Sequence, residues 1–495
     1  IKPKKFTFMK NLKFIVIALV ALFISASVVA QEKPQTLTLP SVVGSNMVLQ
    51  HSTTVNIWGW AKPKATVKVD PSWDNNKKPI KVKANEEGLW ILPIHTLSAS
   101  YDAHSIIIKA GKEVKEITNI LFGEVWLCAG QSNMEWPVRK TPDMQHYIKG
   151  EKNPYIRLYC TGRIASSTPQ KEVPTQRKYR ASWTTCTSKA VGNFSAVGYG
   201  FGKELQETLG VPVGLIDASY GGTPVEGWLS AEYLVNNPKV AAAAKKTKNK
   251  KWGKKISHLH NANIYPIRHY NIAGTIWYQG CSNLDDNDHY DTMMARMVQQ
   301  WREDWGDKEN AMPFYYVMIA PYIYKSSDDI AYPLFVENQV RALSKIPNCG
   351  MAATTDIGEE RCIHPAQKFE VGQRLAALAL AQTYGQQGFE YKAPQMAAYE
   401  IKDGKAKIKM SNCDLGLSPS YGEAVVGFEI AGEDKVFHKA EATISAQQEV
   451  TVWSDKVAQP VAVRYSFRNF APGNLKNVFG IPAVPFRTED WNDVK

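Results

Sequence analysis

Apolar and polar residues alternate in short stretches along the first part of the chain. Segments such as TVNIWGW, ATVKVD and HSIIIKA show this alternation and are separated by turns that contain Pro, Gly, Asn and Lys. A period of two residues is typical of strands that are buried on one face. Residues 31–119 are therefore predicted to form an N-terminal all-β domain.

The pattern changes between residues 120 and 390. Continuous apolar runs such as EVWLCAG and VPVGLIDAS precede amphipathic helical patterns such as FSAVGYGFGKELQETLG, which ends in Gly. Apolar strands that alternate with helices are typical of a parallel sheet covered on both faces. We expect an α/β fold, with a three-layer α/β/α domain over residues 120–390. Short β patterns return over residues 391–495, where we expect a C-terminal β segment that packs with the N-terminal β domain.

The first thirty residues have the layout of a secretory signal. Lys10 and Lys13 precede an apolar run from Phe14 to Ile24, and small residues lead to Ala30. This run is shorter than the ~20 residues that span a membrane. Residues 1–30 are predicted to be a cleaved signal, with residues 1–8 an artefact of start-site choice. We expect export to the periplasm or the cell exterior, without membrane insertion after cleavage.

Charge and cysteine content narrow the classes of function. The formal net charge is +12, but five lysines lie in the first thirty residues and seven lie between Lys245 and Lys255. The basic charge is therefore confined to a lysine-rich insertion at about 239–257, which is typical of a solvated loop rather than a nucleic-acid site. The seven cysteines form no CxxC pair and no Cys/His ladder, so we expect no structural metal.

Four turns after predicted strands carry residues with catalytic potential. Ser132 in CAGQSNMEW follows a buried strand, and His364 in CIHPAQKF precedes a long helix. Ligands of open α/β sheets bind at the carboxyl ends of the strands. A serine there needs a histidine to remove its proton, although a helix-capping Ser and a structural His are the simpler interpretations of each motif alone.

The other two turns offer hydrogen-bond donors. Paired Gly221 and Gly222 leave backbone N–H groups uncovered, as an oxyanion site requires, although a plain turn has the same pattern. The turn GCSNLDD follows the run GTIWYQ, and the side-chain amides beside it could complete an oxyanion hole. Cys281 in this turn could be a nucleophile, a metal ligand, half of a disulfide or a small buried residue.

The order of these motifs resembles the sialate O-acetylesterase family of the SGNH-type hydrolase superfamily. The resemblance rests on GQSNM (130–134), GLIDASYGGTPVEGW (214–228), WYQGCSN (277–283) and IHPAQKFEVGQRLA (363–376). Flanking segments such as LPSVVGSNMVLQ and VFGIPAVPFRTEDW are also similar to that family. The resemblance implies an SGNH-like catalytic domain that hydrolyses O-acetyl esters on a sugar without a metal or cofactor.

The resemblance also implies roles for individual residues. Ser132 is expected to be the nucleophile and His364 the base. The oxyanion donors are expected to be the backbone N–H groups of Ser132 and Gly222, together with the side chains of Gln279 and Asn283. The expected substrate is O-acetylated sialic acid, with other acetylated glycans such as xylan as the alternative. A carbohydrate-binding protein that has lost catalysis is an alternative of another class.

Two positions depart from the family pattern. Cys281 stands where the family usually has Glu, and Cys362 stands where it usually has an Asp that supports the histidine. We expect these two cysteines to form a disulfide, with a nucleophilic Cys281 or two free thiols as alternatives. The imidazole then needs another acidic partner, for which Asp356, Glu359 and Glu360 are candidates. A backbone carbonyl could serve instead, and a Ser–His dyad whose acidic partner is unassigned is the favoured arrangement.

Overall fold

The computed structural model describes residues 36–74, 78–142, 144–149, 152–175, 180–245, 255–419, 424–446 and 448–491. The predicted signal and most of the lysine-rich insertion lie outside these ranges. Within them, no helix has both the length and the apolar character that a membrane span requires.

In β3 and β5 of the N-terminal domain, buried residues alternate with more exposed ones, as predicted. In β3 the pattern is strictly alternating, because one face of its sheet packs on the core and the other meets solvent. β2 pairs with β5, and β3 pairs with both β4 and β6. The strands are β1 (Val48–Gln50), β2 (Thr54–Trp60), β3 (Thr66–Pro71), β4 (Ile80–Lys83), β5 (Leu89–His95) and β6 (Ser100–Ala110).

A single long strand, β7 (Glu113–Gly130), links this domain to the next. Its first half pairs with β6 in the β domain, and its second half lies in the central sheet between β10 and β11. The predicted domain boundary at residue 119 therefore falls inside a continuous strand. The remaining strands of the central sheet are β8 (Ile156–Cys160), β9 (Thr184–Thr185), β10 (Val213–Ser219), β11 (Gly274–Tyr278), β12 (Phe314–Val317) and β13 (Cys349–Ala352).

The central sheet has the order β13-β12-β11-β7-β10-β8-β9, and all its neighbouring pairs are parallel except β8 with β9. Helices cover both faces, so that every residue of β10 and β11 is buried. On one face Trp126 of β7 contacts Phe201, and on the other Trp277 of β11 contacts Trp301. The predicted three-layer α/β/α fold is confirmed.

The two helical layers are formed by the longer helices. Those that cover the Trp126 face include α5 (Ala196–Leu209) and α10 (Lys368–Gln382), which pack on each other. Those that cover the Trp277 face include α8 (Tyr290–Asp304) and α9 (Ala331–Ala342). Shorter helical segments are α2 (Ser132–Glu135), η1 (Val138–Lys140), α3 (Met144–Ile148), α4 (Ser188–Asn193), η2 (Val225–Trp228), α6 (Ala231–Asn236), α7 (Pro238–Ala244), η4 (His260–Ile264), η5 (Tyr265–Ile267) and η6 (Cys281–His289).

The C-terminal segment forms a separate antiparallel unit. Its two four-stranded sheets have the orders β14-β15-β20-β19 and β18-β17-β21-β23, and β16 pairs with β22. The strands are β14 (Gln395–Lys402), β15 (Lys405–Ser411), β16 (Leu417–Ser418), β17 (Phe428–Ala431), β18 (His438–Lys439), β19 (Glu441–Ala446), β20 (Glu449–Trp453), β21 (Ala462–Tyr465), β22 (Lys476–Asn477) and β23 (Phe486–Arg487).

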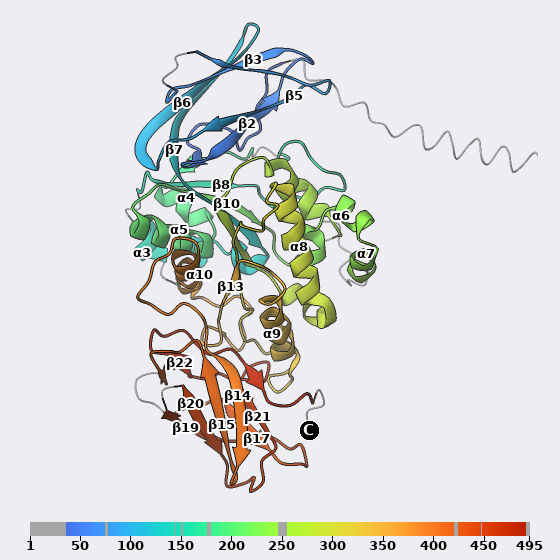
Figure 1. Cartoon of the computed structure of the whole chain (residues 1–495), viewed down its shortest axis with the longest axis vertical. Helices are drawn as coiled ribbons and strands as arrows, with labels where there is room; N and C mark the ends of the chain where they lie inside the picture. The colour runs from blue at the N-terminus through green and yellow to red at the C-terminus, as the bar shows by residue number, and fades with distance from the viewer. Residues whose placement is uncertain are drawn as a thin grey trace, which may run out of the picture.

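The two β units lie at opposite ends of the molecule, with the α/β domain between them (Figure 1). The expected packing of the C-terminal segment on the N-terminal domain is therefore wrong. The N-terminal domain is fixed at the amino ends of the parallel strands because β7 runs out of it into the sheet. The C-terminal unit instead contacts α9, where Arg487 donates to both oxygens of Glu337 at 2.7 and 3.0 Å. It also contacts the loop after β12, where the side chain of Asn469 donates to the carbonyl oxygens of Ile323 and Ser326.

Asp356, which follows β13, joins the α/β domain to the C-terminal unit. Its carboxylate accepts from Arg374 of α10 at 2.8 and 2.9 Å and lies 3.0 Å from the ammonium group of Lys476 in β22. Burial alone would raise the pKa of Asp356, but these two cations hold it below its ordinary value. The ion pairs therefore stabilise the folded protein above the ordinary pKa, and this contribution is lost as pH falls through the lowered one.

We predict that Asp356→Asn lowers the free energy of unfolding by about 1.5–3 kcal/mol at neutral pH, because it removes charge-assisted hydrogen bonds from a mostly buried group. The difference from wild type should vanish in acid. Urea unfolding at several pH values measures both effects. The control is Asp285→Asn, which breaks an exposed pair with Lys325 and should change stability by less than about 1 kcal/mol. Equal losses in the two variants would contradict the prediction.

Candidate active site

Ser132 is placed at the carboxyl end of β7 by a close approach of two backbones. Gly130 has a φ of 137°, and a Cβ atom there would lie 2.3 Å from the carbonyl oxygen of Tyr278. Only glycine permits this contact. The next residue, Gln131, donates its backbone N–H to the same carbonyl at 2.9 Å. The chain then turns into α2, which begins at Ser132.

His364 lies in the loop between β13 and α10, and this loop brings it to the serine. The Nε2 atom of His364 is 2.8 Å from the Oγ atom of Ser132. The loop is braced from within, because Glu359 accepts from the backbone N–H of Ala366 at 2.6 Å. Two residues that the sequence places 232 positions apart are therefore in hydrogen-bond contact, in the geometry that a nucleophile and its base require.

The imidazole of His364 stacks on Trp136, with ring centroids 4.8 Å apart and an interplanar angle of 23°. The ammonium group of Lys140 lies 4.9 Å from the centroid of the same tryptophan ring. Partial burial, followed by the positive charges of Lys368 and Lys140, lowers the pKa of His364 below its ordinary value of 6.5. The histidine is therefore unprotonated, and able to act as a base, at and somewhat below neutral pH.

No carboxylate lies within ion-pair distance of His364 in the described part of the chain. Asp356 is wrong as the acidic partner, because Arg374 and Lys476 hold its carboxylate. The backbone carbonyl of Glu360 accepts from the N–H of Ile323, and within the described residues no hydrogen bond or ion pair joins Glu360 to the imidazole. At the position of the family's supporting acid, the thiol of Cys362 is 3.3 Å from the carbonyl oxygen of His364 itself.

Cys281 and Cys362 are both free thiols, so the expected disulfide is not formed in the structure. Cys281 instead lies 3.7 Å from the hydroxyl oxygen of Tyr324. Burial raises the pKa of its thiol, which opposes formation of the thiolate that a cysteine nucleophile needs. In the structure Cys281 is thus a packed, free thiol rather than half of a disulfide.

Gln279 and Asn283 have hydrogen-bond partners of their own in the structure, and their expected oxyanion role stays a prediction. Both are buried. The amide of Gln279 donates to the Thr223 carbonyl at 3.0 Å and to Asn283 at 2.8 Å, while the Asn283 amide donates to Glu226. These hydrogen bonds support the turn before η2.

The glycine pair lies beside the serine. A Cβ atom on Gly221 would be 3.3 Å from that of Ser132, and the Gly221 N–H donates to Glu135 at 2.7 Å. Gly222 adopts a φ of 67° at this turn. The oxyanion roles of the Ser132 and Gly222 N–H groups remain predictions.

A pocket of about 250 Å³ opens over the serine and histidine. Beside them, its walls include Glu135, Trp136, Lys140, Arg163, Tyr220 and Gly221. The guanidinium group of Arg163 bonds to Glu135, and both Arg163 and Lys140 are largely exposed at the rim. Sequence reasoning did not single out Glu135, Lys140 or Arg163, because a charged residue on a loop has no pattern that distinguishes it from ordinary surface.

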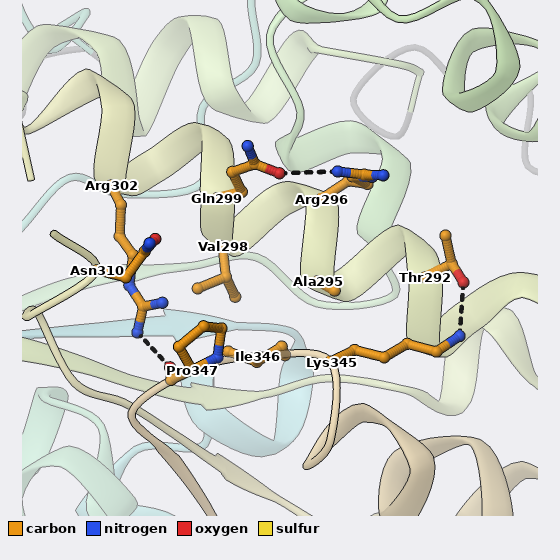
Figure 2. A pocket seen from close by; sticks show the side chains of 10 residues that line it. All are labelled: Thr292, Ala295, Arg296, Val298, Gln299, Arg302, Asn310, Lys345, Ile346 and Pro347. Carbon is orange, nitrogen blue, oxygen red and sulfur yellow. Dashed lines mark hydrogen bonds between the residues drawn. The ribbon is translucent and has the colours of Figure 1, made fainter. Parts of the chain in front are cut away.

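A second hollow, of about 530 Å³, lies between α8 and the segment that follows α9 (Figure 2). Its polar groups already have partners: Lys345 bonds to Asp291 and Thr292, and Arg302 donates to the carbonyl oxygens of Met312 and Pro347. None of its residues lines the pocket over Ser132. The Ser132 pocket is thus the one with catalytic groups. In the described part of the chain, no cluster of acids, histidines and cysteines is suited to a metal ion.

Comparisons with known proteins agree with this geometry. Residues 122–381 match the model of the family described as carbohydrate esterase, sialic acid-specific acetylesterase. The chain belongs to this family. The sialate O-acetylesterase of Homo sapiens is 29% identical over 403 residues, which cover 75% of this chain and 76% of that protein. The Mus musculus protein of the same name is 27% identical over 416 residues, 73% and 76% of the two chains.

The crystal structure of a carbohydrate acetylesterase from Xanthomonas citri is similar to almost the whole of this chain. Its TM-score is 0.82 and its sequence identity is 32%, with 92% of this chain and 100% of that chain covered. The chain is therefore a carboxylic ester hydrolase of carbohydrate-esterase type, and the resemblance seen in its motifs is confirmed.

We predict that the acid limb of the pH profile of this esterase lies below pH 6.5. His364 of the free enzyme must be unprotonated to act as a base. Because its pKa is lowered, it stays unprotonated at a lower pH than an ordinary histidine would. Measuring kcat/KM for an aryl acetate between pH 4 and 8 tests this. Lys140→Gln removes one of the two charges that lower the pKa, so the limb should move to higher pH. An acid limb that lies above pH 6.5 and that Lys140→Gln does not move would contradict the assignment of His364 as the base.

Proposed function

We propose that the protein removes O-acetyl groups from sialic acid by serine-esterase chemistry. Ser132 Oγ attacks the acetyl carbonyl carbon while His364 Nε2 takes the hydroxyl proton. The sugar oxygen leaves with that proton, and the acetyl group stays on Ser132 as an ester. Water, deprotonated by the same nitrogen, then releases acetate and restores the serine. The 2.8 Å contact between Oγ and Nε2 is the observation that carries this mechanism.

The stacked tryptophan replaces part of what a supporting carboxylate would do. During the attack the imidazole of His364 becomes positively charged, and a cation over an aromatic face is stabilised by about 0.5–2 kcal/mol. The ring of Trp136 lies in this position and also limits rotation of the imidazole. A dyad of Ser132 and His364 is therefore sufficient for the proposed chemistry.

The charges at the pocket rim favour an anionic sugar. Lys140 and Arg163 are positive, and Glu135, the acid in the pocket wall, is already bonded to Arg163. The exposed ammonium group of Lys140 thus has no counter-charge among the residues of the pocket wall. Sialic acid carries a carboxylate, whereas the acetylated backbone of xylan does not. The names of the mammalian relatives also support the sialic acid assignment.

We predict that O-acetylated N-acetylneuraminic acid is hydrolysed with a higher kcat/KM than acetylated xylo-oligosaccharides. Lys140→Gln should raise KM for the sialic acid substrate about three- to tenfold, because one charge-assisted contact is lost. It should leave KM for the neutral substrate nearly unchanged. Acetate release measures both values, with Ser132→Ala as the inactive reference.

The matched control is Lys189→Gln, which removes an exposed lysine on α4 outside the catalytic pocket. It should change neither KM. Faster hydrolysis of the xylan substrate, together with no effect of Lys140→Gln, would support the alternative function as an esterase for neutral glycans. Full acetate release by Ser132→Ala would refute the proposed mechanism itself. Membership of an esterase family favours either activity over a purely sugar-binding role.

Export to the periplasm or cell exterior is also part of the proposal, and it rests on the pattern of residues 9–30. We predict that the protein produced from the full sequence is cleaved after about residue 30 and recovered outside the cytoplasm. Cell fractionation with intact mass measurement tests this. Recovery of uncleaved protein in the cytoplasm would overturn it.

A further inference from the structure

Lys368, the first residue of α10, is fully buried. A buried lysine is rare because removing an ammonium group from water is costly unless a partner compensates it. No carboxylate of the described chain lies within ion-pair distance of this lysine. Its ammonium group instead donates to the Oδ1 atom of Asn133 at 2.6 Å and lies 5.8 Å from the centroid of the Tyr278 ring. A neutral amide and an aromatic ring thus hold the charge.

Asn133 extends this contact to the histidine loop. While its oxygen accepts from Lys368, its Nδ2 atom donates to the carbonyl oxygen of Ile363 at 3.1 Å. Asn133 directly follows Ser132, and Ile363 directly precedes His364. One buried side chain therefore connects the backbone that carries the nucleophile to the backbone that carries the base, and Lys368 fixes the orientation of that side chain.

We propose that Lys368 is a positioning residue, which holds Asn133 and through it the Ile363 carbonyl, so that Ser132 and His364 keep their contact without a carboxylate behind the imidazole. The proposal rests on the function proposed above for Ser132 and His364. It explains why a costly buried lysine lies beside the one loop that must be placed accurately. Asn133 alone could rotate its amide, whereas an ammonium group that donates to Oδ1 leaves only Nδ2 to face the carbonyl.

The charge of Lys368 also acts on His364. The groups that influence the lysine are Cys281 of η6 and Cys362 and Glu359 of the histidine loop, while Lys140 is the other cation that influences His364. Burial lowers the pKa of Lys368 to about 7. Below pH 7 the lysine is therefore protonated, and in this range its positive charge opposes protonation of His364. Loss of the charge should raise the pKa of His364.

The first test is Lys368→Met, which keeps most of the length of the side chain but removes both the hydrogen bond and the charge. We expect kcat for an aryl acetate to fall about tenfold or more, with KM changed less than about threefold. The acid limb of kcat/KM should move to higher pH. A merely structural role would leave that limb in place in the protein that remains folded, as measured by circular dichroism.

Asn133→Asp is a second test that does not depend on burying an apolar side chain. The carboxylate still accepts from Lys368, so the fold is retained, but it cannot donate to the Ile363 carbonyl. We expect a similar fall in kcat and an acid limb at higher pH, because the new negative charge favours protonated His364. The control is Lys345→Met, at the hollow of Figure 2, which should change neither quantity.

The outcomes separate this proposal from the proposed function. If Ser132→Ala is inactive while Asn133→Asp and folded Lys368→Met keep the wild-type kcat and acid limb, Lys368 is not a positioning residue. If Lys368→Met does not fold, the kcat of Asn133→Asp decides the question in the same way. Acetate release by Ser132→Ala would instead show that the catalytic pair itself is wrong.

Discussion

The hydrogen bond between Ser132 and His364 is the contact on which the catalytic proposal depends. It joins the end of β7 to the loop after β13, and these strands are separated by β11 and β12 in the sheet. A loop that crosses such a distance needs its own support. Glu359 within the loop, Asp356 at its start and Arg374 in α10 provide that support through hydrogen bonds and ion pairs. These contacts hold the loop, and with it the imidazole of His364, in position beside Ser132.

The absence of a carboxylate partner shifts the work of orientation to other groups. In a Ser–His–Asp triad the acid both orients the imidazole and stabilises its positive charge. In the described part of this chain those two tasks are divided. Trp136 covers one face of the imidazole ring. The hydrogen bonds from Lys368 to Asn133 and from Asn133 to the Ile363 carbonyl fix the backbone beside that ring. The result is a site in which a cation, rather than an anion, is buried near the base.

Sequence reasoning succeeded where the signal was local. Alternating and continuous apolar runs predicted the β and α/β layers, and the position of Ser132 after a buried strand predicted its place at the sheet edge. It failed where the answer depended on packing between distant segments. The partners of Gln279 and Asn283, the burial of Lys368 and the free state of the two thiols depend on tertiary contacts that leave no periodic pattern.

The position of the C-terminal unit was missed for the same reason. Strand patterns predict that a β unit forms but not which surface it contacts. That surface is chosen by pairs such as Arg487 with Glu337 and Lys476 with Asp356, whose members are 150 and 120 positions apart. Individual charged residues at such separations cannot be matched from one sequence.

The continuity of β7 makes the catalytic domain and the N-terminal β domain inseparable. The strand that begins at Glu113 among the β sheets ends two residues before Ser132, so no linker lies between the two units. A recombination or truncation near residue 119 would cut the central strand of the parallel sheet rather than free a module. In this chain the strand that presents the nucleophile is therefore anchored at its other end in the N-terminal domain, so a change that shifts that domain would also move Ser132.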